Sequence, residues 1–241
     1  IDKNVKTDIA VLGDCKETLV AVTELLEKNN HREWRDSFLP CEEKEYEAVV
    51  EKEIHPKEGQ ITMGEVVHAV SEATNHQAVL VTDVGQNQMF AARYFKFSQK
   101  RSMVTSGGLG TMGFGLPAAI GAAFGAPNRT ICFFCGDGGL QMTIQELGTI
   151  METGTNVKII LLNNSFLGMV RQWQELFFKE RYSNTPMINP DFVKIASAYG
   201  IKGRKVQQRE ELAGAIEEML ATDGSYLLEV EVEQVGMVYP M

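Results

Sequence analysis

Apolar runs alternate with amphipathic segments along most of the chain, and this alternation predicts its elements. Apolar stretches predict β-strands at residues 78–83, 101–105, 130–135 and 158–162, near 206, and at 226–232. Helical spacing of apolar residues predicts helices at 62–73, 86–94, 112–125, 143–153, 168–179 and 210–221. Asn189-Pro190 predicts the cap of one more helix, with Pro190 at its first position. We therefore expect an α/β fold with an open, mostly parallel sheet and helices on both faces.

The first 60 residues follow a different pattern. Residues 8–12 predict a short strand and residues 17–28 a helix with one apolar face, as at the end of a truncated domain. The charge-rich segment 29–60 predicts a linker with an exposed helix. A capping box at Thr62 and Glu65 opens a domain that we expect to run over 61–234. Residues 235–241 are expected to be a truncated C-terminal tail.

Composition narrows the classes of partner. The 241 residues are 44% hydrophobic and 23% charged, which is ordinary for a globular protein. A net charge of −9 without a Lys/Arg cluster argues against nucleic acid or an anionic membrane as the main partner. No apolar stretch is long enough to span a membrane.

Four cysteines do not form a disulfide scaffold at this length, so we expect a reducing compartment, the cytoplasm. Cys132 and Cys135 are expected to be buried, inert thiols.

Two strand ends carry the most informative chemistry. Gly136-Asp137-Gly138 follows the apolar run 131–135, and Asn163-Asn164 closes the run 158–162. If these runs are neighbouring parallel strands, Asp137 and Asn164 lie together at the carboxyl edge, where open α/β sheets bind ligands. A carboxylate, an amide and bare glycine backbone suit an oxygen-ligated divalent cation that also holds phosphate.

Three further patterns leave alternatives open. Residues 108–113 match G-x-G-x-x-G, which is also typical of a dinucleotide site, although such a site needs neither the glycines around Asp137 nor the amide pair. Residues 83–88 follow a strand and open a helix, which suits either phosphate binding or a plain helix start. Met169, Trp173 and Phe177 form a helical stripe that indicates either core or the wall of a pocket.

These motifs resemble a known family. GDG followed by NN at this separation is the thiamine diphosphate binding motif. With TSGGLGTMGFGLPAAIGAAFG, GDGGLQMTIQELGTI and VKIILLNNSFLGMVRQWQELF, residues 61–232 resemble the C-terminal domain of the large catalytic subunit of acetolactate synthase (acetohydroxyacid synthase). The GMV-x-QW segment narrows the likeness to this enzyme, and residues 1–28 are similar to the end of the family's middle, FAD-associated domain.

The resemblance implies a thiamine diphosphate-dependent transferase of branched-chain amino-acid biosynthesis. It decarboxylates pyruvate and condenses the product with pyruvate or 2-oxobutanoate, with Mg²⁺ as metal and FAD in the full-length enzyme. The resemblance leaves a second thiamine diphosphate enzyme, a 2-oxo acid decarboxylase or oxidase, as the main alternative. A nucleotide-binding α/β regulatory module is a more distant one.

The resemblance also implies roles for individual residues. Asp137, Asn164 and the Phe166 carbonyl would ligate Mg²⁺. Met169 and Trp173 would line the substrate channel. The residues expected to bind the cofactor are Gly85, Gln86, Asn87, Gly110, Met112, Gly136, Asp137, Gly138, Gly139, Asn164, Phe166, Gly168 and Met169. Among these, Gly110 would accept a hydrogen bond from the pyrimidine amino group, Met112 would hold the two rings bent, and Asn87 stands where many relatives have His.

The resemblance places no catalytic residue in this stretch. The glutamate that activates the cofactor is expected in an N-terminal domain of the partner subunit. The implied enzyme is therefore a homodimer with a shared site, which in this family is joined by a small regulatory subunit. This stretch alone is expected to be inactive.

Overall fold

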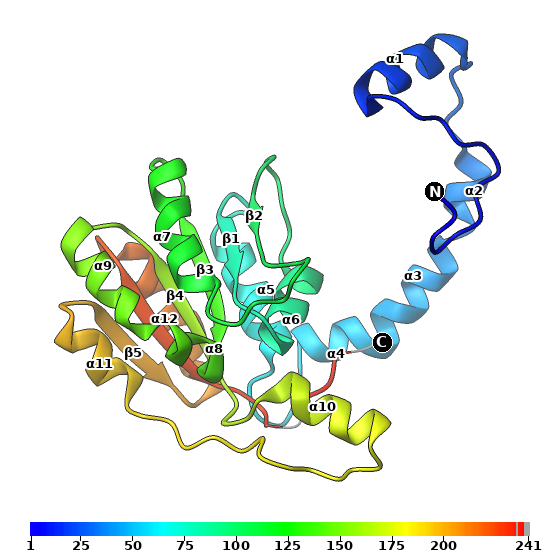
Figure 1. Cartoon of the computed structure of the whole chain (residues 1–241). Coiled ribbons are helices and arrows are strands. Elements are labelled where there is room, and N and C mark those ends of the chain that lie inside the picture. The colour runs from blue at the N-terminus through cyan, green and yellow to red at the C-terminus, as the bar shows by residue number, and fades with distance from the viewer. Residues whose placement is uncertain (235, 239–241) are drawn as a thin grey trace. The chain divides into compact units, whose positions relative to one another are not determined.

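The computed structural model describes residues 1–234 and 236–238, which divide into two compact units at Lys44 and Glu45 (Figure 1). The first unit contains α1 (Cys15–Leu25) and α2 (Arg32–Asp36), and α3 (Leu39–Glu45) ends at the boundary. None of these helices has a buried residue. The predicted domain limits at 28, 60 and 234 stay a prediction, and Val235 and residues 239–241 of the predicted tail lie outside the described residues.

The strand predicted at residues 8–12 was wrong, because this segment has no regular secondary structure. A β-strand needs a neighbouring strand for its backbone hydrogen bonds, and residues 1–44 contain none. The helix predicted at 17–28 is present as α1, which begins two residues earlier. Asp14 caps it by accepting hydrogen bonds from the Lys16 and Glu17 backbone N–H groups.

The second unit begins with a π-helix, η1 (Tyr46–Val50), and α4 (Glu51–Ile54), which lie in the predicted linker. Strands and helices then alternate as the sequence predicts. The helices are α5 (Met63–Ala73), α6 (Gln86–Tyr94), α7 (Gly115–Gly125), α8 (Asp137–Met142), the 3₁₀-helix η2 (Ile144–Glu146), α9 (Leu147–Thr153), α10 (Gly168–Phe177), α11 (Phe192–Ala198) and α12 (Arg209–Ala221). The strands are β1 (Val79–Thr82), β2 (Met103–Val104), β3 (Ile131–Gly136), β4 (Lys158–Asn163), β5 (Lys202–Val206) and β6 (Tyr226–Glu231).

All six strands form one sheet in the order β2-β1-β3-β4-β6-β5, and every pairing is parallel. β3 and β4 are neighbours, with Gly136 level with Leu162. The last strand along the chain, β6, lies between β4 and β5. The predicted open parallel sheet is confirmed.

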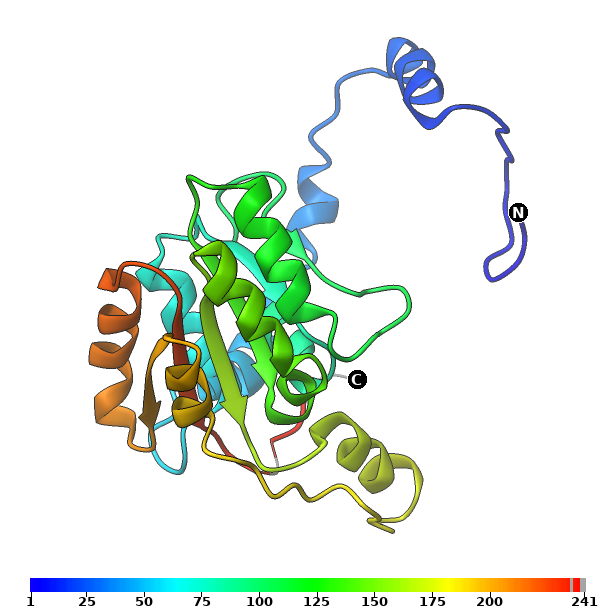
Figure 2. The same cartoon turned by 60° about the vertical axis from the view of Figure 1, so that its left-hand side comes forward.

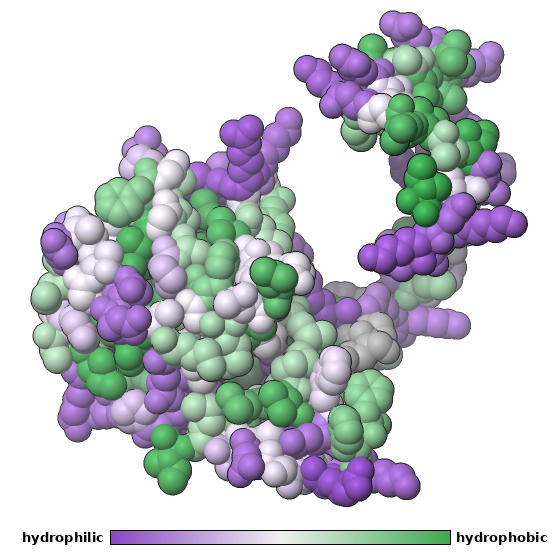
Figure 3. Space-filling view, in the orientation of Figure 1, coloured by the Kyte–Doolittle hydropathy of each residue, from purple (hydrophilic) through white to green (hydrophobic). Residues whose placement is uncertain are grey.

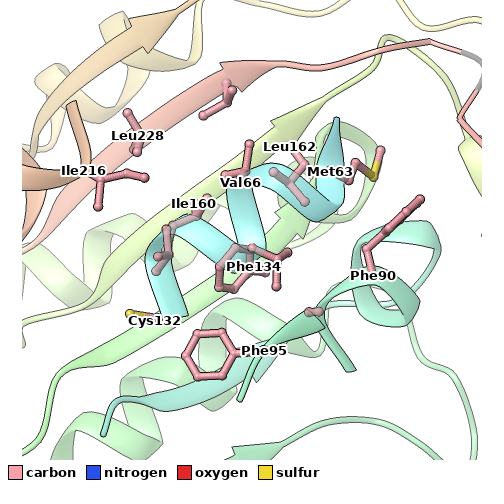
Figure 4. Close-up of a cluster of buried hydrophobic side chains, with 14 of the residues drawn as sticks. Met63, Val66, Phe90, Phe95, Cys132, Phe134, Ile160, Leu162, Ile216 and Leu228 are labelled. Atoms are coloured by element: carbon pink, nitrogen blue, oxygen red, sulfur yellow. The ribbon is translucent and has the colours of Figure 1, made fainter. Parts of the chain in front are cut away.

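Helices cover both faces of this sheet (Figure 2). Apolar residues of α5, α6 and α12 pack on one face in a single buried cluster, and those of α7, α8, α9 and α11 pack on the other. Figure 4 shows the first cluster, where Met63 and Val66 of α5 lie over Phe134 of β3 and Leu162 of β4. The alternation of the strand side chains between the two clusters explains why the strands read as continuous apolar runs.

Two local predictions are corrected. A helix, α8, begins directly at Asp137, where the sequence predicts only a glycine turn. The cap of α11 is Asp191, whose side chain accepts a hydrogen bond from the Lys194 backbone N–H, and not Asn189. The helix therefore starts at Phe192, after Pro190, and the Asn189 side chain is used elsewhere.

Cys132 and Cys135 are buried as predicted. They belong to the two opposite apolar clusters, so the sheet separates their thiols. Burial raises the pKa of Cys132 to about 12 and raises that of Cys135 well above its ordinary value. Both thiols are therefore protonated and unreactive at neutral pH.

Among the described residues, no helix combines the length and apolarity needed to cross a bilayer.

Candidate functional site

The site is built at the carboxyl ends of β3 and β4. Asp137 directly follows β3, and Asn164 directly follows β4. Because the two strands are parallel neighbours, both residues lie at the same edge of the sheet. Their side chains are almost fully buried, at 1% and 4% exposure, and both line one cavity.

This cavity brings together nearly all of the residues that the sequence singled out. It has an empty volume of about 430 Å³, including the part open to solvent. Its lining comes from β1–α6, β3–α8 and β4–α10, with one residue from α5 and one from the loop between β2 and α7. The lining residues are Met63, Val84, Gly85, Gln86, Asn87, Met112, Gly136, Asp137, Gly138, Gly139, Leu162, Asn164, Phe166, Leu167, Gly168, Met169 and Val170. Gly110 is not among them, and Trp173 lines a neighbouring hollow that shares Met169 and Val170.

The glycines of the cavity are packed closely against neighbouring side chains. A Cβ atom on Gly138 would lie 2.8 Å from Leu167 Cδ2, and one on Gly139 would lie 2.3 Å from Asp83 Oδ1. A Cβ on Gly168 would lie 2.1 Å from Gln86 Oε1. The bare backbone at the start of α8 therefore leaves room for an anionic group to approach closely.

Asp83, at the end of β1, fixes the loop opposite α8. Its buried carboxylate accepts hydrogen bonds from the backbone N–H groups of Val84 (2.8 Å), Gly113 (3.0 Å) and Gly115 (2.9 Å). These bonds hold the segment that carries Met112 against the end of β1. This role of Asp83 was missed, and the signal in the sequence was an acidic residue at the end of an apolar run.

The start of α6 forms a second wall. Gly85 has φ +121°, a conformation that favours glycine. Asn87 Nδ2 donates to the Val84 carbonyl (3.2 Å), but Asn87 Oδ1 is buried without a hydrogen-bond partner among the described residues. A buried acceptor without a partner is costly, so this atom indicates a missing donor in the cavity. Gln86 Nε2 donates to Gln172 Oε1 (2.8 Å) and to the Gly236 carbonyl (2.7 Å).

The amide pair after β4 forms a tight turn. Asn163 Oδ1 accepts from the Ser165 backbone N–H (3.1 Å), and Asn164 Oδ1 accepts from the Phe166 backbone N–H (3.2 Å). Ser165 has a positive φ of +56°, a conformation that occurs in turns held by hydrogen bonds to Asn side chains. The turn directs the chain back across the edge of the sheet and leads into α10.

Burial sets the electrostatics of Asp137. It raises the pKa of the carboxyl above its ordinary value, while hydrogen bonds from Asn189 Nδ2 (2.7 Å) and the Gly138 backbone N–H (2.9 Å) oppose that shift. A bound cation would stabilise the ionised carboxylate further. Asn189 was missed as a site residue because its sequence context, Asn-Pro, is typical of a helix cap.

The helix α10 presents apolar side chains to solvent beside the cavity. Figure 3 shows apolar surface over this helix. Trp173 is 52% exposed and Phe177 64% exposed, and their rings pack edge to face at 5.7 Å. The stripe predicted from Met169, Trp173 and Phe177 therefore forms no core within the described residues, and Met169 forms part of the cavity wall.

The donor set fits a divalent cation that carries phosphate. No group of three or more His, Cys, Asp or Glu side chains converges to hold a metal in the described part of the chain. One carboxylate and amide oxygens therefore need further oxygen ligands, which phosphate provides. A dinucleotide site fits less well, because β1 separates β2, which precedes residues 108–113, from β3, which precedes Asp137. Fold and site together define an α/β domain whose carboxyl sheet edge has a donor set that suits a cation and a diphosphate.

Comparison with known proteins identifies the family. Residues 83–230 match the model of the thiamine pyrophosphate enzyme C-terminal TPP binding domain, so the chain belongs to this family. The expected thiamine diphosphate-binding fold is thereby confirmed, and all the residues that line the cavity except Met63 lie within the matched residues.

The sequence relatives extend the likeness over the whole chain. It is 40% identical over 242 residues to the mitochondrial acetolactate synthase catalytic subunit of Saccharomyces cerevisiae, which covers all of this chain and 35% of that protein. It is 41% identical to the acetolactate synthase large subunit of Lactococcus lactis, covering all of this chain and 41% of that protein. It is 47% identical over 173 residues to the isozyme 2 large subunit of Escherichia coli, covering 71% and 32%. The expected resemblance to acetolactate synthase large subunits is confirmed.

A solved structure shares the fold. The thiamine diphosphate-dependent 4-hydroxybenzoylformate decarboxylase of Rhodococcus jostii RHA1 superposes with a TM-score of 0.66 and 27% identity, over 71% of this chain and 32% of that one. The chain spans about a third to two fifths of the length of these curated relatives.

Proposed function

We propose that this chain is the cofactor-binding C-terminal part of an acetolactate synthase catalytic subunit. The observation that carries the proposal is the placement of Asp137 and Asn164 at the ends of two neighbouring parallel strands, around one cavity floored by Gly138 and Gly139. The identity of 37–47% to acetolactate synthase subunits supports this enzyme over other thiamine diphosphate enzymes. The reaction is the decarboxylation of pyruvate followed by condensation with pyruvate or 2-oxobutanoate.

In this proposal, Asp137, Asn164 and the Phe166 carbonyl hold Mg²⁺, and diphosphate oxygens complete its coordination. The backbone of Gly138 and Gly139 and the start of α6 hold the diphosphate, because N–H groups at helix starts favour anions.

Bound thiamine diphosphate would supply the chemistry that splits and forms the carbon–carbon bonds. The residues of this chain hold and orient it. Gly110 and Met112 are proposed to contact the pyrimidine and the bend between the rings, with Met112 at the cavity wall. Met169 and Trp173 are proposed to line the path of the second 2-oxo acid, because Met169 lines both the cavity and the neighbouring hollow and Trp173 lines that hollow.

The remaining components lie outside this chain. We propose a homodimer in which the partner subunit supplies the activating glutamate, with FAD bound by the full-length enzyme and a small regulatory subunit as a further partner. The chain alone would therefore bind the cofactor without turning over substrate. All four cysteines are free, two of them on the surface, which supports a reducing compartment such as the cytoplasm.

A calorimetric titration tests the proposal. The chain is expected to bind thiamine diphosphate only when Mg²⁺ is present, and Asp137→Ala is expected to weaken this binding by at least about a hundredfold, because it removes the one carboxylate of the site. Asp191→Ala, which removes an exposed carboxylate that caps α11, serves as the control and should bind like the original chain.

Two results would contradict the proposal. Binding of NAD without a Mg²⁺ requirement would instead support a nucleotide-binding module. For the reaction, product analysis of the full-length protein should give acetolactate from pyruvate, and acetaldehyde or acetyl phosphate in its place would assign a decarboxylase or an oxidase.

A further inference from the structure

The carboxylate of Asp137 is held by a side chain from a distant part of the chain. Asn189 Nδ2 donates one hydrogen bond to Asp137 Oδ2 (2.7 Å) and another to Asn163 Oδ1 (3.0 Å). Asn189 Oδ1 accepts a hydrogen bond from Gln141 Nε2 (3.1 Å). All the hydrogen-bonding atoms of this amide are thus used, and both N–H bonds point at residues of the two strand ends that form the site.

The direction of these bonds is fixed by a residue of β6, the strand next to β4. Glu229, in the middle of β6, is buried at 3% exposure and its carboxylate can only accept when ionised. Asn163 Nδ2 donates to Glu229 Oε1 (2.8 Å), so Asn163 Oδ1 faces Asn189. Lys205 of β5 lies 3.4 Å from the same Glu229 oxygen and balances its charge.

This chain of bonds leaves Asn189 one orientation. Because Asn163 and Asp137 both present acceptor oxygens, Asn189 must turn its NH₂ group toward them. A carboxylate has about four acceptor positions in total, and Asn189 and the Gly138 N–H occupy two of them. These two bonds leave acceptor capacity on the carboxylate for a cation.

We propose that Asn189 is a positioning residue for the cation site, which sets the rotamer of Asp137 and is itself oriented by Asn163 and Glu229. The inference rests on the proposed cation and diphosphate site and extends it to residues outside the cavity lining. Partners that hydrogen-bond a metal-ligating carboxylate typically change metal affinity by about 10–100-fold. Asn189→Ala is therefore expected to weaken cation binding about tenfold or more.

The experiment measures Mn²⁺ binding by electron paramagnetic resonance, on the full chain with saturating thiamine diphosphate. Four proteins are compared: the original chain, Asn189→Ala, Gln141→Ala and Asp191→Ala. Gln141→Ala removes the bond that holds the Asn189 carbonyl and should weaken Mn²⁺ binding a few-fold. Asp191→Ala removes the α11 cap two residues from Asn189 but no bond to Asp137, so its Mn²⁺ affinity should be unchanged.

Each result has one meaning. A tenfold loss in Asn189→Ala with unchanged affinity in Asp191→Ala supports the inference. Unchanged affinity in Asn189→Ala overturns it, and so does an equal loss in Asp191→Ala, which would show a general effect of α11. If Asn189→Ala does not fold, the Mn²⁺ affinity of Gln141→Ala tests the inference instead. An unchanged Mn²⁺ affinity in Gln141→Ala then overturns it. No Mn²⁺ binding by the original chain would overturn the proposed function itself.

Discussion

Gly139 shows how one residue serves both the ligand and the packing of the fold. Its backbone lies on the cavity floor, and its Cα faces the buried carboxylate of Asp83, which bonds three backbone N–H groups. A side chain at this position would push against a group that cannot move without losing those bonds. The glycine is therefore required even before any ligand binds.

We expect Gly139→Ala to lower the free energy of unfolding by about 1–3 kcal/mol, because the added Cβ would lie 2.3 Å from Asp83 Oδ1. The measurement is urea unfolding of the chain without ligand. Gly121→Ala in α7 is the control, since a Cβ there meets nothing within 4 Å. It should raise stability by about 0.5–1 kcal/mol through better helix propensity. Equal effects of the two variants would contradict the role of Asp83.

At the scale of elements, the junction of α4 and α5 contains a carboxylate in an unfavourable place. Glu53 Oε1 accepts from the Gly64 backbone N–H (2.9 Å) at the start of α5. Burial, followed by the nearby charges of Glu233 and Glu65, raises the pKa of Glu53 above its ordinary value, although the Gly64 bond opposes this. The folded state thus holds the proton of Glu53 to higher pH than the unfolded chain does.

The sign of the pH dependence follows. As pH rises from the ordinary pKa of Glu53 to its raised value in the fold, the unfolded chain ionises first and stability is lost. Glu53→Gln keeps an acceptor for Gly64 and removes the charge, so it should be more stable than the original chain at pH 8, by up to about 1 kcal/mol, and gain less at pH 4. Urea unfolding at both pH values measures this. Glu47→Gln, at an exposed position of η1, should show no such difference, and a gain independent of pH in Glu53→Gln would refute the explanation.

Elements with a strong apolar pattern were predicted correctly from the sequence. Elements whose formation depends on long-range contacts were not. The helix at 86–94 was placed correctly, and the strands near 131 and 158 were placed to within a residue, because apolar runs are local signals. α8 was missed because three of its first four residues are Asp and Gly, which local propensity assigns to a turn. The strand at 8–12 was wrong because a strand depends on partners that sequence spacing does not show.

The candidate site was predictable to the same extent. Asp137 and Asn164 follow apolar runs that are consecutive strands along the chain, so taking these strands as parallel neighbours places both residues at one edge. Asn189 and Glu229 could not be found in this way, because they reach Asp137 and Asn163 from 52 and 66 residues away. Contacts at such separations depend on the order of strands in the sheet, which no local pattern of this sequence specifies.

At the scale of the whole molecule, the two units differ in how much apolar surface each buries. The helices of the first unit have no buried residue, whereas the second has two extensive apolar clusters on its sheet. A chain that begins at Glu45 should therefore retain the unfolding free energy of the second unit within about 0.5 kcal/mol, and its thiamine diphosphate affinity. Calorimetric unfolding and cofactor titration measure both.

The control is a chain that begins at Ile61. It lacks Ile54, which is buried in the core cluster, and Glu53, which bonds the start of α5, so it should be clearly less stable. Loss of cofactor binding in the chain from Glu45 would show that residues 1–44 support the site.

The position of β6 has a consequence for how the protein is made. During synthesis, Asp137 and Asn164 leave the ribosome well before the strand that must insert between β4 and β5. Until Glu229 arrives on that strand, Asn163 has no carboxylate to orient it, and Asn189 has no fixed direction toward Asp137. A nascent chain that has completed β4 therefore carries the motif residues but not their alignment, and the proposed cation site matures only when β6 is in place.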